Sequence, residues 1–205
     1  LDADAVVTPV SSNSVVERSA WFARVLRTRI GSPFVIEGMQ LVHEEGANRV
    51  VGYEANGGFL TLTPIEIDGR ELTALPTRDA VIVALAVALL ARRQGVPVSQ
   101  LAMHLPARFT ASDRLKDFPA EISKNRIADL AENPQRLVQL LPGLGSVART
   151  DATDGLRVTF DNDEVVHLRP SGNAPELRCY TEADSAQRAR DLNAMCLDRL
   201  QSWRR

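Results

Sequence analysis

The residues best suited to chemistry lie in one short segment, Arg169-Pro-Ser-Gly-Asn-Ala-Pro-Glu-Leu-Arg178. Its first arginine offers a planar fork of N–H donors and its serine a hydroxyl, while the Gly-Asn backbone lets consecutive N–H groups point at one anion. This combination suits a phosphate group. The alternative is a polar hairpin loop whose arginine is only solvated, because Ser, Gly, Asn and Pro are also the usual residues of turns.

A second segment, Gly52-Tyr-Glu-Ala-Asn-Gly-Gly-Phe59, suits a neutral polar ligand. Asn-Gly between β-rich flanks is a type I′ hairpin signal, and turn chemistry alone explains these glycines. Glu54 favours a different interpretation, because a carboxylate at the mouth of such a turn can accept two sugar hydroxyls.

The other polar residues do not form a set of metal ligands or a catalytic group. The histidines are scattered, at His43, His104 and His167. His167 precedes Arg169 by two residues, so the two side chains share a strand face by alternation alone. Ser11-Ser12-Asn13 is read as a strand-end loop and Asp151–Gly155 as a turn, so no catalytic residue and no metal site is expected in this chain.

Composition narrows the class of protein. The chain has 205 residues, 44% hydrophobic and 24% charged. Its net charge of −2 gives no reason to expect nucleic acid, whose binding usually needs a basic face. The apolar run Ala80–Ala91 is too short to span a bilayer. Cys179 and Cys196 lack metal spacing and are read as reduced core thiols, so we expect a cytoplasmic protein. From the net charge and the length of the apolar run, we expect no nucleic-acid partner and no membrane partner.

The first half of the sequence alternates strand and helix patterns. Strands are expected at 5–10, 24–30, 49–53 and 59–67, and a helix from Ser32, as N-cap, to about Glu45. A longer helix is expected over Leu75–Gly95, capped by Thr77 and closed by Gly95. Being apolar on nearly every side, this helix is predicted to be packed on both sides. The alternation predicts an α/β domain over residues 1–107.

The second half has a different pattern, after an expected hinge at Leu105–Arg108. An extended run (108–115), a helical region (123–141, interrupted at Pro134), strands over 155–182 and a terminal helix capped by Asp184 or Ser185 are expected. They predict an α+β domain over residues 108–205, with an antiparallel sheet and helices on one face.

In their order, these segments resemble the C-terminal half of the α-D-phosphohexomutase family, the phosphoglucomutases and phosphomannomutases. Gly52–Gly58 resembles the family's sugar-recognition loop, G-E-x-S-G-H, and Arg169–Pro175 its phosphate-binding loop, R-x-S-G-T-x-P. Thr28–Gly31 resembles a third-domain loop that approaches the substrate. The resemblance covers the whole chain and implies a third domain with a mixed sheet and helices on both faces, followed by a fourth domain of the TATA-box-binding-protein-like type.

The resemblance implies two binding sites. Phosphate binding would fall to Arg169, Ser171, Gly172 and Asn173, and sugar binding to Glu54, Asn56, Gly57 and Arg29. The chain departs from the family motifs at four positions: Tyr53 is an extra residue, Asn56 replaces serine, Gly58 replaces histidine and Asn173 replaces threonine. The imidazole that helps to position the substrate in the family therefore has no counterpart at position 58.

The resemblance also implies what a longer protein would do. Such an enzyme is an intramolecular phosphotransferase that interconverts hexose 1-phosphate and hexose 6-phosphate, of glucose or mannose, through a phosphoserine and a hexose 1,6-bisphosphate intermediate. Its serine loop and its Mg²⁺ loop, D-G-D-G-D-R, belong to the first two domains and do not occur in this sequence. Because the chain begins at a leucine just before a strand, we expect it to be a piece that lacks these N-terminal domains and is inactive alone.

Two alternatives stay open. A non-catalytic phosphosugar- or anion-binding module derived from the mutase fold would lack the same motifs. A phosphoglucosamine mutase would keep the architecture and change only the sugar. The sequence leaves the preferred sugar and the oligomeric state undecided.

Overall fold

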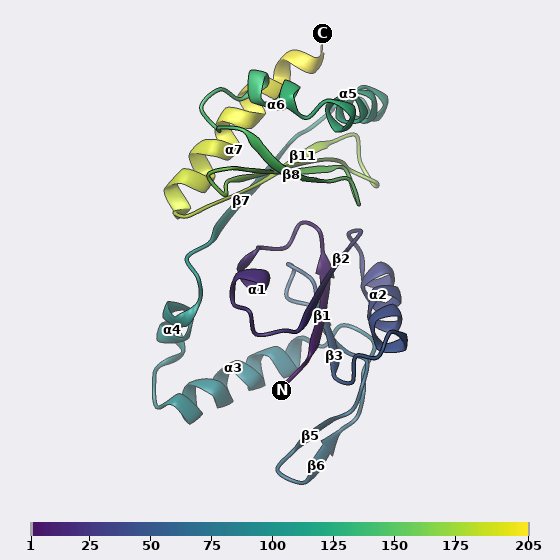
Figure 1. Cartoon of the computed structure of the whole chain (residues 1–205), viewed down its shortest axis with the longest axis vertical. Helices are drawn as coiled ribbons and strands as arrows, with labels where there is room; N and C mark the ends of the chain where they lie inside the picture. The colour runs from purple at the N-terminus through teal and green to yellow at the C-terminus, as the bar shows by residue number, and fades with distance from the viewer. Residues whose placement is uncertain (1, 205) are drawn as a thin grey trace. The chain divides into compact units, whose positions relative to one another are not determined.

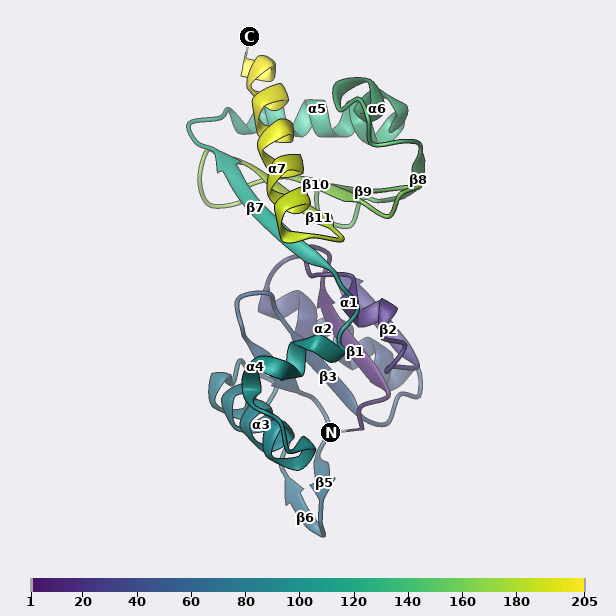
Figure 2. The same ribbon diagram turned by 90° about the vertical axis from the view of Figure 1, so that its left-hand side faces the viewer.

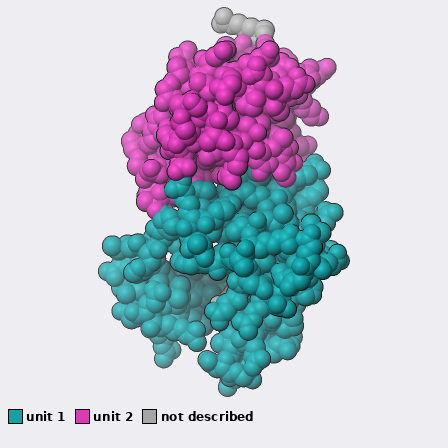
Figure 3. Space-filling view, viewed as in Figure 1, with its two compact units in different colours: residues 1–106 teal, residues 107–205 magenta. Residues whose placement is uncertain are grey.

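The chain folds into two compact units. The computed structural model describes residues 2–204, and contacts divide them into one unit that ends at Pro106 and another that begins at Ala107 (Figure 3). Each unit has its own sheet and its own buried cluster.

The first unit is built on a mixed sheet in the order β2-β1-β3-β4. Its strands are β1 (Ala5–Pro9), β2 (Arg24–Thr28), β3 (Val50–Tyr53) and β4 (Phe59–Thr61). β1 is parallel to β2 and β3, and β4 is antiparallel to β3. The loops that follow the three parallel strands therefore leave from the same edge of the sheet, where α/β folds commonly bind ligands.

Helices cover both faces of this sheet, as predicted (Figure 1). The helix α2 (Ser32–Glu44) buries Val35, Met39 and Val42 in a cluster with the sheet residues Val7 and Leu60. The opposite face holds a smaller cluster in which Val16 of the short helix α1 (Val15–Arg18) packs with Val6 and Val51. Strand alternation explains this division, since Val6 and Val7 point to opposite faces.

The rest of the first unit runs from β4 to the junction with the second. A two-stranded hairpin, β5 (Ile65–Ile67) and β6 (Arg70–Leu72), comes first. It is followed by α3 (Ala80–Gln94), α4 (Val98–Leu101) and the 3₁₀ turn η1 (Ala102–His104). The expected strand at 59–67 is therefore two separate strands, β4 and β5.

The prediction that α3 is packed on both sides is wrong. Ala91 is the one residue of α3 classed as buried among those described, whereas Val81 is 76% exposed, Leu85 56% and Leu89 48%. Hydrophobic composition favours burial but does not specify a neighbour that supplies it. The helix therefore presents aliphatic side chains on its surface.

The beginning of α3 also differs from the prediction, and its end agrees. Asp79, not Thr77, is the N-cap, and its carboxylate accepts hydrogen bonds from the backbone N–H groups of Val81 and Ile82. A carboxylate also complements the positive end of the helix dipole, which a threonine hydroxyl does less well. Gly95 ends the helix in the left-handed conformation, with φ of 67°.

Within residues 2–204, no single helix is long and apolar enough to cross a membrane, although α3 taken together with Val98–His104, across a bend of 84°, meets the length and composition criteria.

The second unit has an antiparallel sheet in the order β7-β11-β10-β9-β8. Its strands are β7 (Phe109–Leu115), β8 (Val147–Asp151), β9 (Leu156–Phe160), β10 (Val165–Pro170) and β11 (Leu177–Ala183). The helices are α5 (Ala120–Glu132), α6 (Gln135–Leu140), α7 (Ala186–Leu200) and the 3₁₀ turn η2 (Gln201–Arg204), and they cover one face (Figure 2). The α+β prediction is confirmed, and Ser185 caps α7 as expected.

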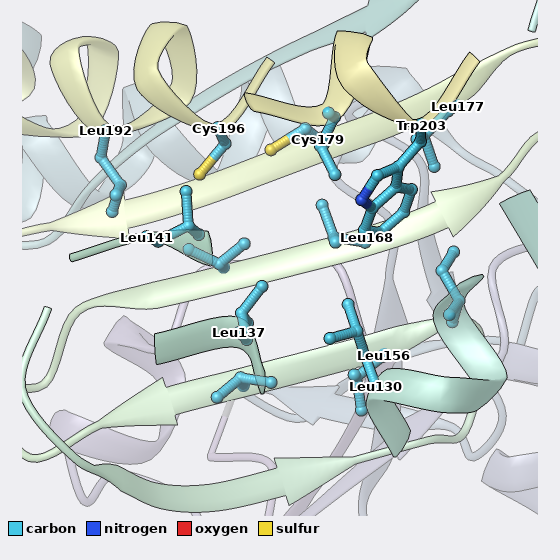
Figure 4. Packing of buried hydrophobic residues seen from close by; sticks show 14 of the residues in the cluster. Leu130, Leu137, Leu141, Leu156, Leu168, Leu177, Cys179, Leu192, Cys196 and Trp203 are labelled. Carbon is cyan, nitrogen blue, oxygen red and sulfur yellow. The ribbon is translucent and has the colours of Figure 1, made fainter. Parts of the chain in front are cut away.

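The core of the second unit lies between the helices and the covered face of the sheet. Leu168 of β10 and Leu192 of α7 belong to it, as does Trp203 (Figure 4). Cys179 and Cys196 face each other there, from β11 and α7, and both are free thiols. The contact with Cys196 and burial raise the pKa of the Cys179 thiol. Both cysteines are therefore core residues, as the sequence indicated.

A buried ion cluster fixes Arg108, the residue before β7. Its Nε lies 2.7 Å from Glu182 Oε1 and its Nη1 2.5 Å from Asp184 Oδ1, while Nη2 donates to the backbone oxygen of Asp163 at 2.6 Å. The guanidinium of Arg157 approaches the same Glu182 from the other side, with Nη2 3.4 Å from Oε2. Arg108 is therefore anchored in the second unit, at the end of the predicted hinge Leu105–Arg108, which stays a prediction.

Candidate functional site

The predicted phosphate-binding residues share one closed loop between β10 and β11. Arg169 is the last but one residue of β10. The Ser171 N–H donates to the Glu176 backbone oxygen at 2.8 Å, and this hydrogen bond closes the loop. Gly172 and Asn173 form its exposed tip, where the Asn173 N–H donates a long hydrogen bond of 3.5 Å to the Ser171 hydroxyl oxygen. A Cβ on Gly172 would meet no atom within 4 Å, so the space beside this part of the backbone is open. An exposed turn of backbone next to an arginine is a suitable anion site.

An aspartate that the sequence analysis read as part of a turn positions Arg169. Asp154 Oδ1 lies 2.9 Å from Arg169 Nε, and both side chains are 15% exposed. The Nε–H is not aligned as a hydrogen bond and has no other partner in the described part of the chain, so the contact is an ion pair. The pair holds the Nε side of the guanidinium and leaves the Nη edge for an anion.

A glycine brings this aspartate close to β10. Gly155 has φ of +80°, and a Cβ there would collide with the backbone oxygen of Leu168 and approach Arg169 Cα at 3.0 Å. Both the backbone conformation and the close approach require glycine. The turn Asp151–Gly155 therefore positions a residue of the phosphate loop.

Two further arginines line up with Arg169 across the sheet. Arg169 lies opposite Arg178 of β11, which lies opposite Arg114 of β7. Like charges in such a row repel one another. Glu176 offsets part of this repulsion, with Oε1 3.1 Å from Arg114 Nε and Oε2 3.4 Å from Arg178 Nη2. Three guanidinium groups against the two carboxylates of Glu176 and Asp154 leave this end of the sheet positive.

His167 shares the sheet face with Arg169 but does not serve as a phosphate donor. Its Nε2 lies 2.7 Å from the Asp154 backbone oxygen, and because a carbonyl only accepts, Nε2 carries the hydrogen. Nδ1 is buried and has no hydrogen-bond partner within residues 2–204. The ring stacks on Tyr180 with centroids 5.3 Å apart. Burial above all, together with the charges of Arg157 and Arg169, lowers the pKa of His167 to about 4.

This pKa predicts that acid weakens the second unit through His167. Between the unfolded value of about 6.5 and the folded value of about 4, the unfolded chain binds a proton that the folded chain does not. The free energy of unfolding should therefore fall as pH falls through this range, by about 3 kcal/mol at most. Urea titrations at pH 7 and pH 4.5 measure the loss. His167→Gln removes the titrating group and should show a smaller loss, and an equal loss in the variant would contradict the assignment.

The sugar loop is a hairpin turn between β3 and β4. The Glu54 N–H donates to the Gly58 backbone oxygen at 2.8 Å, and the Gly57 N–H donates to the Glu54 oxygen at 3.0 Å. Gly57 has φ of 90°, whereas Asn56 does not have positive φ, so the turn is not of type I′. Asn56 Oδ1 accepts from the Gly58 N–H at 3.0 Å, which leaves its amide NH₂ to face a ligand.

Glu54 is the buried acid of this loop. Its side chain is 7% exposed, and its Oε2 accepts a hydrogen bond from the Ser32 hydroxyl at 2.8 Å. The expectation that Ser32 caps α2 is wrong: Gly31 is the N-cap, and the Ser32 hydroxyl bonds to Glu54 instead. A long-range bond to a carboxylate has replaced a local bond to the backbone. It joins the beginning of α2 to the sugar loop.

Arg29 is placed at the same sheet edge but outside the contacts of Glu54. It is exposed, and its guanidinium lies over the Phe34 ring, 4.6 Å from the centroid. At an exposed site such a cation–π contact contributes about 0.5–1 kcal/mol, so it favours this position of the arginine in the loop Thr28–Gly31.

Arg78 lies beside the sugar loop, although its sequence position gives no sign of this. Its Nε lies 3.7 Å from Glu54 Oε2, and its side chain is 57% exposed. Its stem covers Gly58, the position at which the resemblance leads one to expect histidine. In the sequence, Arg78-Asp79 before an apolar run indicates only the beginning of a helix.

Comparisons with known proteins match both units of the chain. Residues 1–109 match the domain family described as phosphoglucomutase/phosphomannomutase, alpha/beta/alpha domain III, and residues 112–199 match the C-terminal domain of the same proteins. A phosphomannomutase of Salmonella muenchen is 42% identical over 203 residues, which are 98% of this chain and 42% of that protein. The chain thus spans less than half the length of this relative.

Solved structures show the same fold at low identity. A phosphoglucomutase/phosphomannomutase family protein from Burkholderia thailandensis matches with a TM-score of 0.66 and 16% identity, over 98% of this chain and 38% of that one. The N-acetylphosphoglucosamine mutase of Aspergillus fumigatus, in complex with GlcNAc-6P and magnesium, matches with a TM-score of 0.62 and 13% identity, over 99% and 40% of the two chains.

Proposed function

Because the chain belongs to the phosphoglucomutase/phosphomannomutase family, we propose that it forms domains three and four of a phosphohexomutase and supplies its sugar and phosphate binding. The boundary of these domains lies near residue 107. The longer enzyme interconverts mannose 1-phosphate and mannose 6-phosphate, and accepts the glucose phosphates. The named activity of the Salmonella muenchen relative supports mannose.

One observation carries this proposal: Arg169 is held by Asp154 beside a loop whose tip, Gly172 and Asn173, is exposed, at the positive end of a sheet. Arg169, Ser171 and the N–H groups of Gly172 and Asn173 bind the phosphate that is not transferred. A fork of charged donors and backbone N–H groups complements a phosphate dianion and orients the sugar attached to it.

The sugar loop binds the hydroxyl groups of the sugar. Glu54 accepts hydrogen bonds from sugar hydroxyls, and Asn56 donates from its amide. Gly57 allows the turn that presents both, and Arg29 adds positive charge at the same edge. These residues bind and orient, and the phosphoryl transfer itself needs a nucleophile from elsewhere in the longer enzyme.

The metal also belongs elsewhere in this proposal. Residues 2–204 contain no group of three or more His, Cys, Asp or Glu side chains that could hold a metal ion. The residues of this chain therefore do not fit the Mg²⁺ site that the resemblance implies, and no step of its chemistry is assigned to them. Hexose 1,6-bisphosphate is proposed as the intermediate of the longer enzyme, whose location is cytoplasmic.

Calorimetric titration of the chain tests the proposal. We expect mannose 1-phosphate and glucose 1-phosphate to bind, mannose to bind far more weakly because it lacks the phosphate, and mannose 1-phosphate to bind the more tightly of the two phosphates. Failure of every sugar phosphate to bind would overturn the proposal.

A second measurement separates an enzyme from a binding module. The chain extended by the residues encoded upstream, assayed with Mg²⁺ and the bisphosphate, should convert mannose 1-phosphate into mannose 6-phosphate. Tight binding without conversion would favour a non-catalytic phosphosugar-binding module. Preference for glucosamine 1-phosphate in both measurements would indicate a phosphoglucosamine mutase instead.

A further inference from the structure

The backbone before α3 is fixed alongside the sugar loop. The Thr61 N–H donates to the Leu75 oxygen at 3.2 Å, and the Leu75 N–H donates to the Thr61 hydroxyl oxygen at 2.9 Å. Four residues later, the Asp79 N–H donates to the Phe59 oxygen at 2.9 Å. These bonds extend the edge of β4 and place Arg78 beside Gly58, far from it in sequence.

The stem of Arg78 occupies the space that a side chain at position 58 would need. A Cβ on Gly58 would lie 2.6 Å from Arg78 Cδ and 2.7 Å from Cγ. Gly58 does not have positive φ, so its backbone conformation does not call for glycine. Glycine at 58 is instead explained by the arginine that packs on it. Gly58 and Arg78 therefore pack as a pair, in which Arg78 provides the side chain at this point of the loop.

The guanidinium of Arg78 complements the carboxylate of Glu54. Within residues 2–204, the side-chain contacts of Glu54 are made through Oε2, with Ser32 and Arg78, so Oε1 is left to accept a hydrogen bond. The Arg78 side chain is 57% exposed, against 7% for Glu54. Arginine only donates and an ionised carboxylate only accepts. An acceptor and a set of donors thus lie side by side at the mouth of the loop.

We propose that Arg78 is a specificity-determining residue that donates to a sugar hydroxyl next to the one that Glu54 accepts from. A hydroxyl can donate one hydrogen and accept another, so a pair of adjacent hydroxyls matches a carboxylate and a guanidinium placed together. This inference rests on the proposed function. It adds Arg78 to the site, where the Glu54–Arg78 pair recognises the configuration of the sugar hydroxyls.

A double-mutant-type cycle, which combines a residue substitution with the removal of one sugar hydroxyl, tests the role of Arg78 by calorimetry. Wild-type chain and Arg78→Ala are titrated with mannose 1-phosphate and its 2-deoxy, 3-deoxy and 4-deoxy analogues. Loss of one hydrogen bond to a charged group should weaken wild-type binding of at least one analogue about tenfold. Arg78→Ala should bind mannose 1-phosphate about tenfold more weakly and show no further loss with that analogue. Arg70→Ala, an exposed arginine of β6, is the matched control and should behave as wild type.

A second variant tests the packing. Gly58→Ala should push the Arg78 stem aside and reproduce the loss of affinity, and the double variant Gly58→Ala, Arg78→Ala should bind no more weakly than Arg78→Ala alone. The role of Arg78 is overturned if Arg78→Ala loses as much affinity for the deoxy analogue as the wild type does. It is also overturned if the losses of affinity in Gly58→Ala and Arg78→Ala multiply in the double variant. In either case the proposed function stands. If the wild-type chain binds none of these ligands, the proposed function fails and this inference fails with it.

Discussion

Arg169→Ala is expected to lower the affinity for mannose 1-phosphate by about 100-fold. Hydrogen bonds to charged groups contribute about 1.5–3 kcal/mol each, and an arginine can make two to one phosphate. A loss near 2.7 kcal/mol corresponds to about 100-fold in Kd. Isothermal titration calorimetry measures the change directly. Mannose, which has no phosphate, should bind the variant and the wild type equally.

Two companion variants make this result specific. Arg169→Lys keeps the charge but loses the planar fork, so its affinity should lie between those of wild type and Arg169→Ala. Arg126→Ala removes an exposed arginine of α5, a helix on the other face of the sheet, and should leave the affinity unchanged. An unchanged Kd in Arg169→Ala would place the phosphate elsewhere and remove the main support for the proposed function.

Glu182→Gln should destabilise the second unit by about 3–5 kcal/mol. The carboxylate lies between Arg108 and Arg157, both nearly fully buried, and the substitution takes a negative charge away from two buried guanidinium groups at once. Trp203 is 8% exposed and Trp21 64%, so tryptophan fluorescence reports mainly on the second unit during urea unfolding. With a slope of about 1–3 kcal/mol per molar urea, the midpoint should fall by more than 1 M.

Asp191→Asn provides the comparison for this measurement. Asp191 is an exposed carboxylate on α7 that accepts a hydrogen bond from Gln187, and its loss should change the free energy of unfolding by less than about 0.5 kcal/mol. A Glu182→Gln midpoint as close to wild type as that of Asp191→Asn would show that other groups balance the two arginines.

Local patterns predicted the elements of the candidate site. Strand signals on both sides of Arg169–Arg178 were confirmed by β10 and β11, and the flanks of the sugar loop by β3 and β4. Such patterns depend on neighbours in the sequence, and these were the parts that composition and alternation could indicate.

Contacts that depend on sheet register were not predictable in this way. Asp154 reaches Arg169 only because the β9–β10 pairing and the glycine turn bring them together. The Ser32 hydroxyl bonds to Glu54, 22 residues away, in place of its own helix. Arg78 reaches Gly58 through backbone bonds to β4. In each case the tertiary fold selects one partner among several that local rules allow.

The exposed apolar surface of α3 shows a different limit of prediction from sequence, which concerns burial. Its run of Val, Leu and Ala correctly predicted a helix with Gly95 at its end. Hydrophobicity alone then predicted burial, but the described part of the chain does not provide the surface that would cover Val81 and Leu85. A sequence pattern can state that a side chain prefers an apolar neighbour without identifying it.

The fixed position of Arg108 makes the covalent link between the two units a short tether. Between η1, which ends at His104, and the ion cluster of Arg108, only Leu105, Pro106 and Ala107 remain, and proline holds its own φ near one value. One buried salt-bridge cluster thus stabilises the sheet of the second unit and also leaves these three residues as the link between the last turn of one unit and the first anchored residue of the other.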